Sequence, residues 1–162
     1  MTTPMLHPDC ETLAGLLGTW RGRGHGEYPT IDSFDYLEEV TFGHVGKPFL
    51  AYGQKTRHAD DDRPLHAEVG YWRPVAPGQL EVVLSHPTGI SELLGGSIEA
   101  IDGGIALDLH TSGIALTPTA KQVTEVHRRF ELVGDTLRYT VAMAAVGKPL
   151  THHLKAELTR AE

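Results

Sequence analysis

The stretch of sequence that decides the fold reads Gly18-Thr-Trp20-Arg-Gly22-Arg-Gly24-His-Gly26. Alternate residues of a β-strand point to the same face, so the four glycines and the tryptophan would share one side. Interior glycine weakens an ordinary core strand. The stretch therefore indicates either a first strand that bends sharply at a barrel corner or a strand against which a ligand lies, and the pattern leaves both interpretations open.

The sequence after Gly18 alternates between apolar and polar residues, with turn-forming residues at nearly even spacing. In one such segment Leu80, Val82 and Leu84 alternate with Glu81. Short alternating segments separated by Gly, Pro and Asp clusters are typical of antiparallel all-β folds, and here they predict about ten strands. We expect these at residues 18–26, 34–44, 49–59, 65–74, 79–86, 90–100, 104–112, 123–132, 136–145 and 150–160. The fold class is therefore all-β, a single antiparallel barrel of the lipocalin or fatty-acid-binding kind.

A short N-terminal helix is expected over residues 8–17. Leu13, Leu16 and Leu17 fall at helical spacing there, and Asp9 can cap the helix. No linker or low-complexity segment divides the chain of 162 residues. We therefore expect residues 1–162 to form one domain, with the helix at 8–17 and the barrel at 18–160.

Composition narrows the choice of partners and of compartment. The net charge of −7 argues against a nucleic-acid partner, which would require a basic face. No apolar run is long enough to cross a membrane, and the first residues lack the features of a secretory signal. The single cysteine, Cys10, excludes an internal disulfide. These features predict a cytoplasmic protein with no membrane partner, and they leave open whether it forms a homodimer.

Histidine is the one unusual feature of the composition, with ten residues. His152 and His153 are neighbours on the last expected strand, so they point to opposite faces and at most one of them faces the interior. The apolar residues Leu154 and Ala156 share the parity of His152, which favours His152 as the inward residue. Lys121 precedes a strand and could pair with a carboxylate ligand at a barrel mouth. No catalytic motif of the common enzyme classes is present.

The sequence resembles the nitrobindin family. The first strand fits its G-x-W-x-G-x-G signature, and Tyr28-Pro29-Thr30 follows as in that family. Further similar segments are His44-Val-Gly-Lys-Pro48, Ala120-Lys121 and Pro149-Leu-Thr-His-His153-Leu154. The similarity extends in order from about Leu16 to Leu158, nearly the whole chain.

The resemblance implies a ten-stranded barrel that holds a b-type haem at its mouth. It implies His153 as the axial ligand of the haem iron, with Thr30 and Lys121 near the haem. Gly18, Trp20, Gly22 and Gly24, on the first strand, would then lie close to the macrocycle. The choice of His153 disagrees with the parity of the last strand. Either a bulge near the start of that strand or a haem at the rim with its own polar environment would reconcile the two.

The function that the resemblance implies is that of a haem-dependent peroxynitrite isomerase. A ferric haem would bind nitric oxide reversibly and convert peroxynitrite to nitrate. The sequence shows no evident acid–base pair on the distal side, which argues against peroxidase chemistry. The alternatives are a lipocalin-like carrier of a small apolar ligand, without metal or catalysis, and a barrel without ligand that acts through partners.

Overall fold

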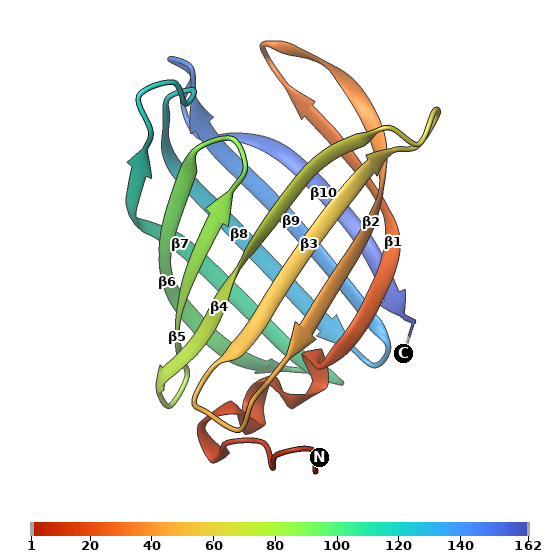
Figure 1. The fold of residues 1–162 in the computed structure, drawn as a ribbon, viewed down its shortest axis with the longest axis vertical. Coiled ribbons are helices and arrows are strands. Elements are labelled where there is room, and N and C mark those ends of the chain that lie inside the picture. The colour runs from red at the N-terminus through yellow and green to blue at the C-terminus, as the bar shows by residue number, and fades with distance from the viewer. Residues whose placement is uncertain (1, 162) are drawn as a thin grey trace.

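Ten antiparallel strands close into a barrel in the computed structural model, which describes residues 2–161 (Figure 1). The strands follow one another around the barrel in chain order, and β1 pairs with β10 to close it. They are β1 (Gly18–Tyr28), β2 (Ile31–Gly43), β3 (Leu50–His58), β4 (Pro64–Ala76), β5 (Gln79–His86), β6 (Ile90–Ile101), β7 (Gly104–Leu116), β8 (Val123–Val133), β9 (Thr136–Ala145) and β10 (Thr151–Arg160). The predicted all-β barrel is confirmed.

The first hairpin is longer than its sequence pattern predicts. β1 continues to Tyr28 and β2 begins at Ile31, so that only Pro29 and Thr30 form the turn. The register between the two strands shifts between Gly26 and Tyr28. Such an irregularity bends the strand locally, which allows pairing to continue to the barrel rim.

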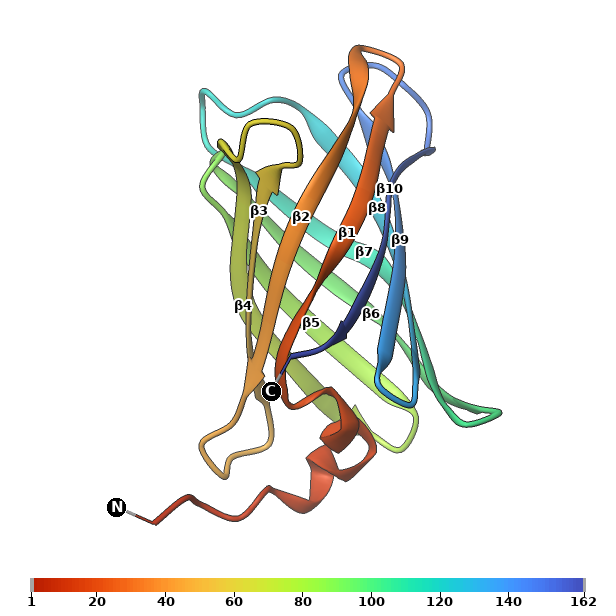
Figure 2. The same ribbon diagram turned by 90° about the vertical axis from the view of Figure 1, so that its right-hand side faces the viewer.

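The N-terminal helix is a 3-10 helix, η1 (Pro8–Leu16), under one end of the barrel (Figure 2). The prediction that Asp9 caps it is wrong. His7 occupies the cap, and its Nδ1 accepts a hydrogen bond from the Asp9 amide at 3.2 Å. Trp20 Nε1 donates to the Leu16 carbonyl at 2.8 Å, which fastens β1 to this helix. Among the described residues, no helix is long and apolar enough to cross a membrane.

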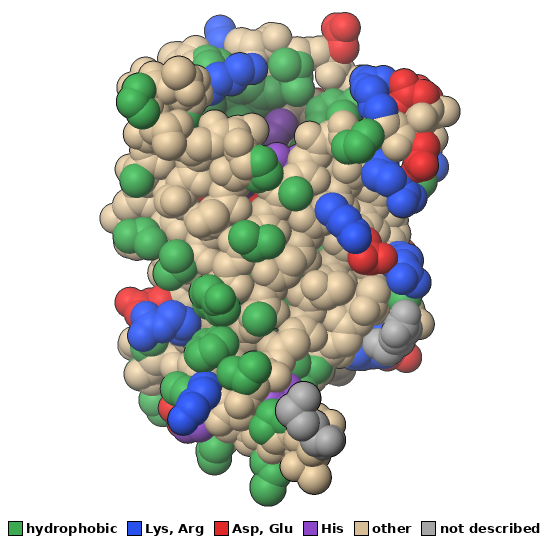
Figure 3. Space-filling model, viewed as in Figure 1, with side chains coloured by type: hydrophobic (Ala, Val, Ile, Leu, Met, Phe, Trp, Pro, Cys, Tyr) green, Lys and Arg blue, Asp and Glu red, His purple; other side chains and the backbone are tan. Residues whose placement is uncertain are grey.

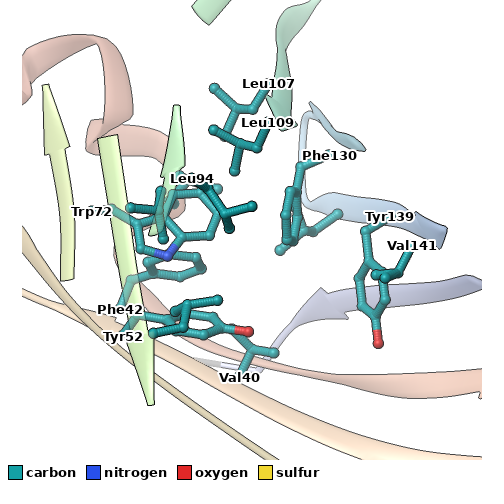
Figure 4. Packing of buried hydrophobic residues seen from close by; sticks show 14 of the residues in the cluster. Val40, Phe42, Tyr52, Trp72, Leu94, Leu107, Leu109, Phe130, Tyr139 and Val141 are labelled. Carbon is teal, nitrogen blue, oxygen red and sulfur yellow. The ribbon is translucent and has the colours of Figure 1, made fainter. Parts of the chain in front are cut away.

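The half of the barrel nearest η1 is filled with apolar side chains. Trp20 is fully buried there. In the same core, Trp72 packs edge-on against Phe42 and Phe130, with ring centroids 4.9 and 5.0 Å apart (Figure 4). Burying a large apolar side chain stabilises the folded state by roughly 1.5–3 kcal/mol, so these side chains contribute to the stability of the fold.

The glycines of β1 leave room for neighbouring parts of the barrel. A Cβ atom on Gly24 would collide with the Tyr36 ring, and one on Gly26 would collide with the Phe34 ring. A Cβ atom on Gly22 would collide with the backbone of β10. Close packing within the barrel therefore explains why these three positions of β1 are glycines, without a ligand lying against the strand.

Candidate functional site

A cavity of about 650 Å³ opens at the end of the barrel away from η1. Figure 3 shows this end hollowed, with hydrophobic side chains around the opening and a histidine visible inside it. The upper walls are mainly apolar and are formed by Ile31, Phe34, Leu65, Ile90, Val123, Val141, Met143 and Leu154. Cavities of this size and character accommodate cofactors and other small molecules.

A β-bulge at the start of β10 turns His153 into this cavity. His152 pairs with Ala142 of β9 and Leu154 pairs with Val141, so His153 is the extra residue between them. The bulge brings His153 and Leu154 both to the cavity wall, while His152 is exposed. Because of this extra residue, inward and outward side chains no longer alternate simply at the start of β10. The expected bulge is confirmed.

The His153 imidazole is held in one tautomer. Its Nδ1 lies 3.0 Å from the carbonyl oxygen of Glu27. A carbonyl can only accept, so Nδ1 carries the proton and Nε2 keeps its lone pair. Burial lowers the pKa of His153, against the opposing effect of this hydrogen bond. The Tyr28 ring packs against the imidazole edge-on, with centroids 5.4 Å apart. The neutral ring is thus held ready to act as a ligand.

Thr30, Lys121 and His153 line the same cavity, so the structure brings these expected site residues together. Thr30 and Lys121 come from the β1–β2 and β7–β8 connections and lie at the rim. Gly18, Trp20, Gly22 and Gly24 do not line the cavity. The Tyr36 ring of β2 covers Gly24, and Trp20 is buried in the half of the barrel nearest η1. Contact of these four residues with a macrocycle is therefore not supported.

The floor of the cavity contains a charged cluster that the sequence did not reveal. Arg128 forms a two-pronged ion pair with Glu68, with Nη1–Oε1 at 2.8 Å and Nη2–Oε2 at 3.1 Å. It also reaches Glu92, with Nη2–Oε1 at 2.9 Å. Burial raises the pKa of Glu68. The charge of Arg128, together with hydrogen bonds from His66 and Arg128, outweighs burial and holds that pKa well below its usual value. All three side chains are therefore charged inside the barrel.

Two histidines lie beside this cluster on the cavity wall. His66 Nε2 is 3.0 Å from His86 Nδ1, and each of these nitrogens faces the Glu68 carboxylate. No acid–base pair is evident in the sequence, whereas the structure brings two histidines and a carboxylate together on the cavity wall. Histidines far apart in the sequence meet here because β4 and β5 are neighbouring strands, and both residues lie near the open end.

A third buried carboxyl group, Glu38, also lines the cavity. Its oxygens accept hydrogen bonds from the Tyr139 hydroxyl and from Gln54 Nε2, both at 2.7 Å. Burial raises the pKa of Glu38 to about 7 despite these hydrogen bonds. The carboxyl group therefore titrates near neutral pH.

One sequence signal could have revealed these buried charges. Glu38 has the same parity as Tyr36 and Val40, and Glu92 the same as Ile90 and Leu94. A charged residue at an inward position of an alternating strand is unusual. Sequence alternation cannot show which inward charges meet across the barrel, because that depends on strand order and stagger.

The comparisons with known proteins are consistent with this geometry. The model of the THAP4-like, heme-binding beta-barrel domain matches residues 9–160. A peroxynitrite isomerase of Nocardia farcinica is 56% identical over 155 residues, covering 96% of this chain and 92% of that protein. Peroxynitrite isomerase 2 of Mycobacterium avium is 61% identical over 155 residues, covering 96% of each. The crystal structure of Rv2717c from M. tuberculosis is 50% identical with a TM-score of 0.95, covering 98% of this chain and 100% of that one.

Proposed function

The chain belongs to the family of THAP4-like, heme-binding β-barrel domains, and from that premise we propose that it is a haem-dependent peroxynitrite isomerase. We further propose that its iron is ferric and binds nitric oxide. The proposal rests on the arrangement of His153. Its imidazole lines the cavity, the Glu27 carbonyl orients the ring through Nδ1, and Nε2 is left unprotonated. The relatives named as peroxynitrite isomerases, similar over 96% of this chain, supply the reaction.

The residues of the cavity fit a haem group. A neutral imidazole whose second nitrogen donates to a carbonyl is the usual arrangement for a histidine that ligates a metal. The apolar upper walls suit the faces of a macrocycle, and the polar rim at Thr30 and Lys121 suits its carboxylates. Lys121 is exposed, so its ion pair with a carboxylate would contribute less than about 1 kcal/mol. The imidazole and the apolar walls must therefore supply most of the affinity.

Each part of the site has a distinct task in the reaction. When bound, the ferric haem supplies a Lewis acid that polarises an oxygen of peroxynitrite. His153 holds the group in place, and the apolar walls limit access of water. The positive charge of Arg128 is balanced by Glu68 and Glu92, so the cavity floor offers no net positive charge to an anionic substrate.

We also propose a cytoplasmic location. Cys10, the single cysteine of the sequence, is buried and forms no disulfide. A free thiol without a disulfide framework is typical of proteins in reducing compartments.

Hemin titration tests the ligand assignment. His153→Ala should abolish or sharply weaken the Soret band, because the axial nitrogen is lost. His152→Ala is the matched control, since His152 is exposed on the same strand, and it should keep most of the band. If the two variants behave in the opposite way, the assignment of His153 is refuted.

Stopped-flow decay of peroxynitrite tests the activity. Wild type loaded with ferric haem should accelerate the decay and raise the nitrate share of the products, and nitric oxide should shift its Soret band. Hemin-treated His153→Ala protein and free hemin are the controls. Decay no faster with wild type than with these controls would refute the isomerase proposal. A protein with no Soret band that binds apolar ligands in the 650 Å³ cavity would instead be a carrier.

A further inference from the structure

Three ligand-type atoms converge on the cavity wall, from β4 and β5. They are His66 Nε2, His86 Nδ1 and Glu68 Oε2. The two nitrogens are 3.0 Å apart, and the Glu68 oxygen lies 3.7 Å from His66 and 3.5 Å from His86. These residues have no part in the proposed haem ligation by His153.

The distances among these three ligand atoms of the His66–Glu68–His86 triad are close to those of a metal site. Zinc binds histidine nitrogen and carboxylate oxygen at about 2.0–2.2 Å, which separates neighbouring ligand atoms of a tetrahedral site by roughly 3.3–3.6 Å. The three edges observed here span 3.0 to 3.7 Å. We propose that His66, Glu68 and His86 form a second metal site, distinct from the haem, that binds a divalent transition metal ion such as Zn²⁺.

The groups around the triad hold it in the form that a metal needs. Glu68 Oε1 accepts from Arg128 Nη1 and from the Tyr52 hydroxyl, both at 2.8 Å. Glu68 Oε2 faces the two histidines and also accepts from Arg128 Nη2 at 3.1 Å. His86 Nε2 is buried and lies 2.8 Å from Glu92 Oε1, an ion-pair contact without hydrogen-bond geometry. A metal-bound histidine commonly has a carboxylate beside its other nitrogen, and such outer partners orient the ligands.

The local charge also favours a cation. Two carboxylates, Glu68 and Glu92, face one guanidinium, Arg128, so this buried group carries one excess negative charge when the histidines are neutral. Two imidazoles and one carboxylate are a donor set that suits zinc and its neighbours in the first transition series more than magnesium or calcium.

One coordination position of this metal would remain open. All three ligands line the cavity, and His66 is partly exposed, with 34% of its side chain accessible. Three protein ligands and one position open to a solvent-filled cavity are typical of zinc sites that bind water. The ion would therefore hold a water molecule at the cavity wall.

Isothermal titration with Zn²⁺, in the full chain without an affinity tag, tests the proposal. A second histidine group, Asp108, His110 and His127, lies on the outer face of β7 and β8 and is removed beforehand. The starting protein is therefore His110→Gln/His127→Gln. We expect it to bind one Zn²⁺ per chain, and Co²⁺ should give the visible absorption of a tetrahedral site.

Three substitutions in that starting protein locate the ion. His66→Gln and His86→Gln should abolish binding, and Glu92→Gln should weaken it about 10–100-fold. His153→Ala should leave binding unchanged, which separates this site from the haem ligand. Hemin titration of His66→Gln should still give a Soret band, showing that the barrel is intact. No Zn²⁺ binding in the starting protein, or equal binding after His66→Gln, would overturn the proposal.

Discussion

The raised pKa of Glu38 makes the stability of this barrel depend on pH near neutrality. The side chain is only 5% exposed, and burial raises its pKa from 4.5 to about 7. The folded state therefore binds more protons than the unfolded state between these two values. The stabilisation from this group is fully present below about pH 4.5 and is lost as the pH rises through about 7.

The magnitude follows from the size of the shift. One pKa unit corresponds to about 1.4 kcal/mol, so a shift from 4.5 to about 7 is worth up to roughly 3 kcal/mol. Most of this change falls between about pH 5 and pH 8. As placed, the Tyr139 hydroxyl and Gln54 Nε2 donate to Glu38 and favour its ionised form, so burial drives the shift. Gln54 Oε1 is buried and has no hydrogen-bond partner among the described residues. A turned Gln54 amide could accept the proton of Glu38.

Urea denaturation of wild type and Glu38→Gln at several pH values measures this effect. Glutamine keeps the shape of the protonated acid but does not titrate. The free energy of unfolding of the variant relative to wild type should therefore rise by roughly 2–3 kcal/mol between about pH 5 and pH 8. Glu39→Gln is the matched control: Glu39 lies outside the cavity, and the hydrogen bond from Arg21 lowers its pKa, so no such rise is expected. A relative stability of Glu38→Gln that does not vary with pH would refute the reasoning.

Three further predictions concern the packing of β1 and the rim of the cavity. Gly24→Val should destabilise the fold by about 1–3 kcal/mol in urea denaturation, because the valine side chain would collide with the Tyr36 ring. The control Gly95→Val has open space around it and should destabilise the fold less. Equal losses of stability in the two variants would contradict this explanation. Trp20→Phe should cost about 1 kcal/mol or more by the same assay, since the hydrogen bond to η1 is lost. Lys121→Ala should weaken hemin binding less than about five-fold in a titration, and a larger loss would show that the lysine is more than an exposed partner.

The alternation of apolar and polar residues determined most of the architecture by itself. Residues in a strand repeat with a period of two, so local sequence contains the number, order and inward face of the strands. A family resemblance in the sequence pointed to the cofactor and to His153, Thr30 and Lys121, and the structure places these three residues in one cavity.

Tertiary structure decided what depends on contacts between strands. The bulge that turns His153 inward is a property of the β9–β10 pairing, and alternation along β10 alone favours His152 instead. The Tyr36 and Phe34 rings of β2 pack over Gly24 and Gly26 of β1 because of the register between these two strands. The cluster of Glu68, Glu92 and Arg128 joins residues of three strands, because closing the barrel brings distant inward positions together and only paired charges are tolerated there.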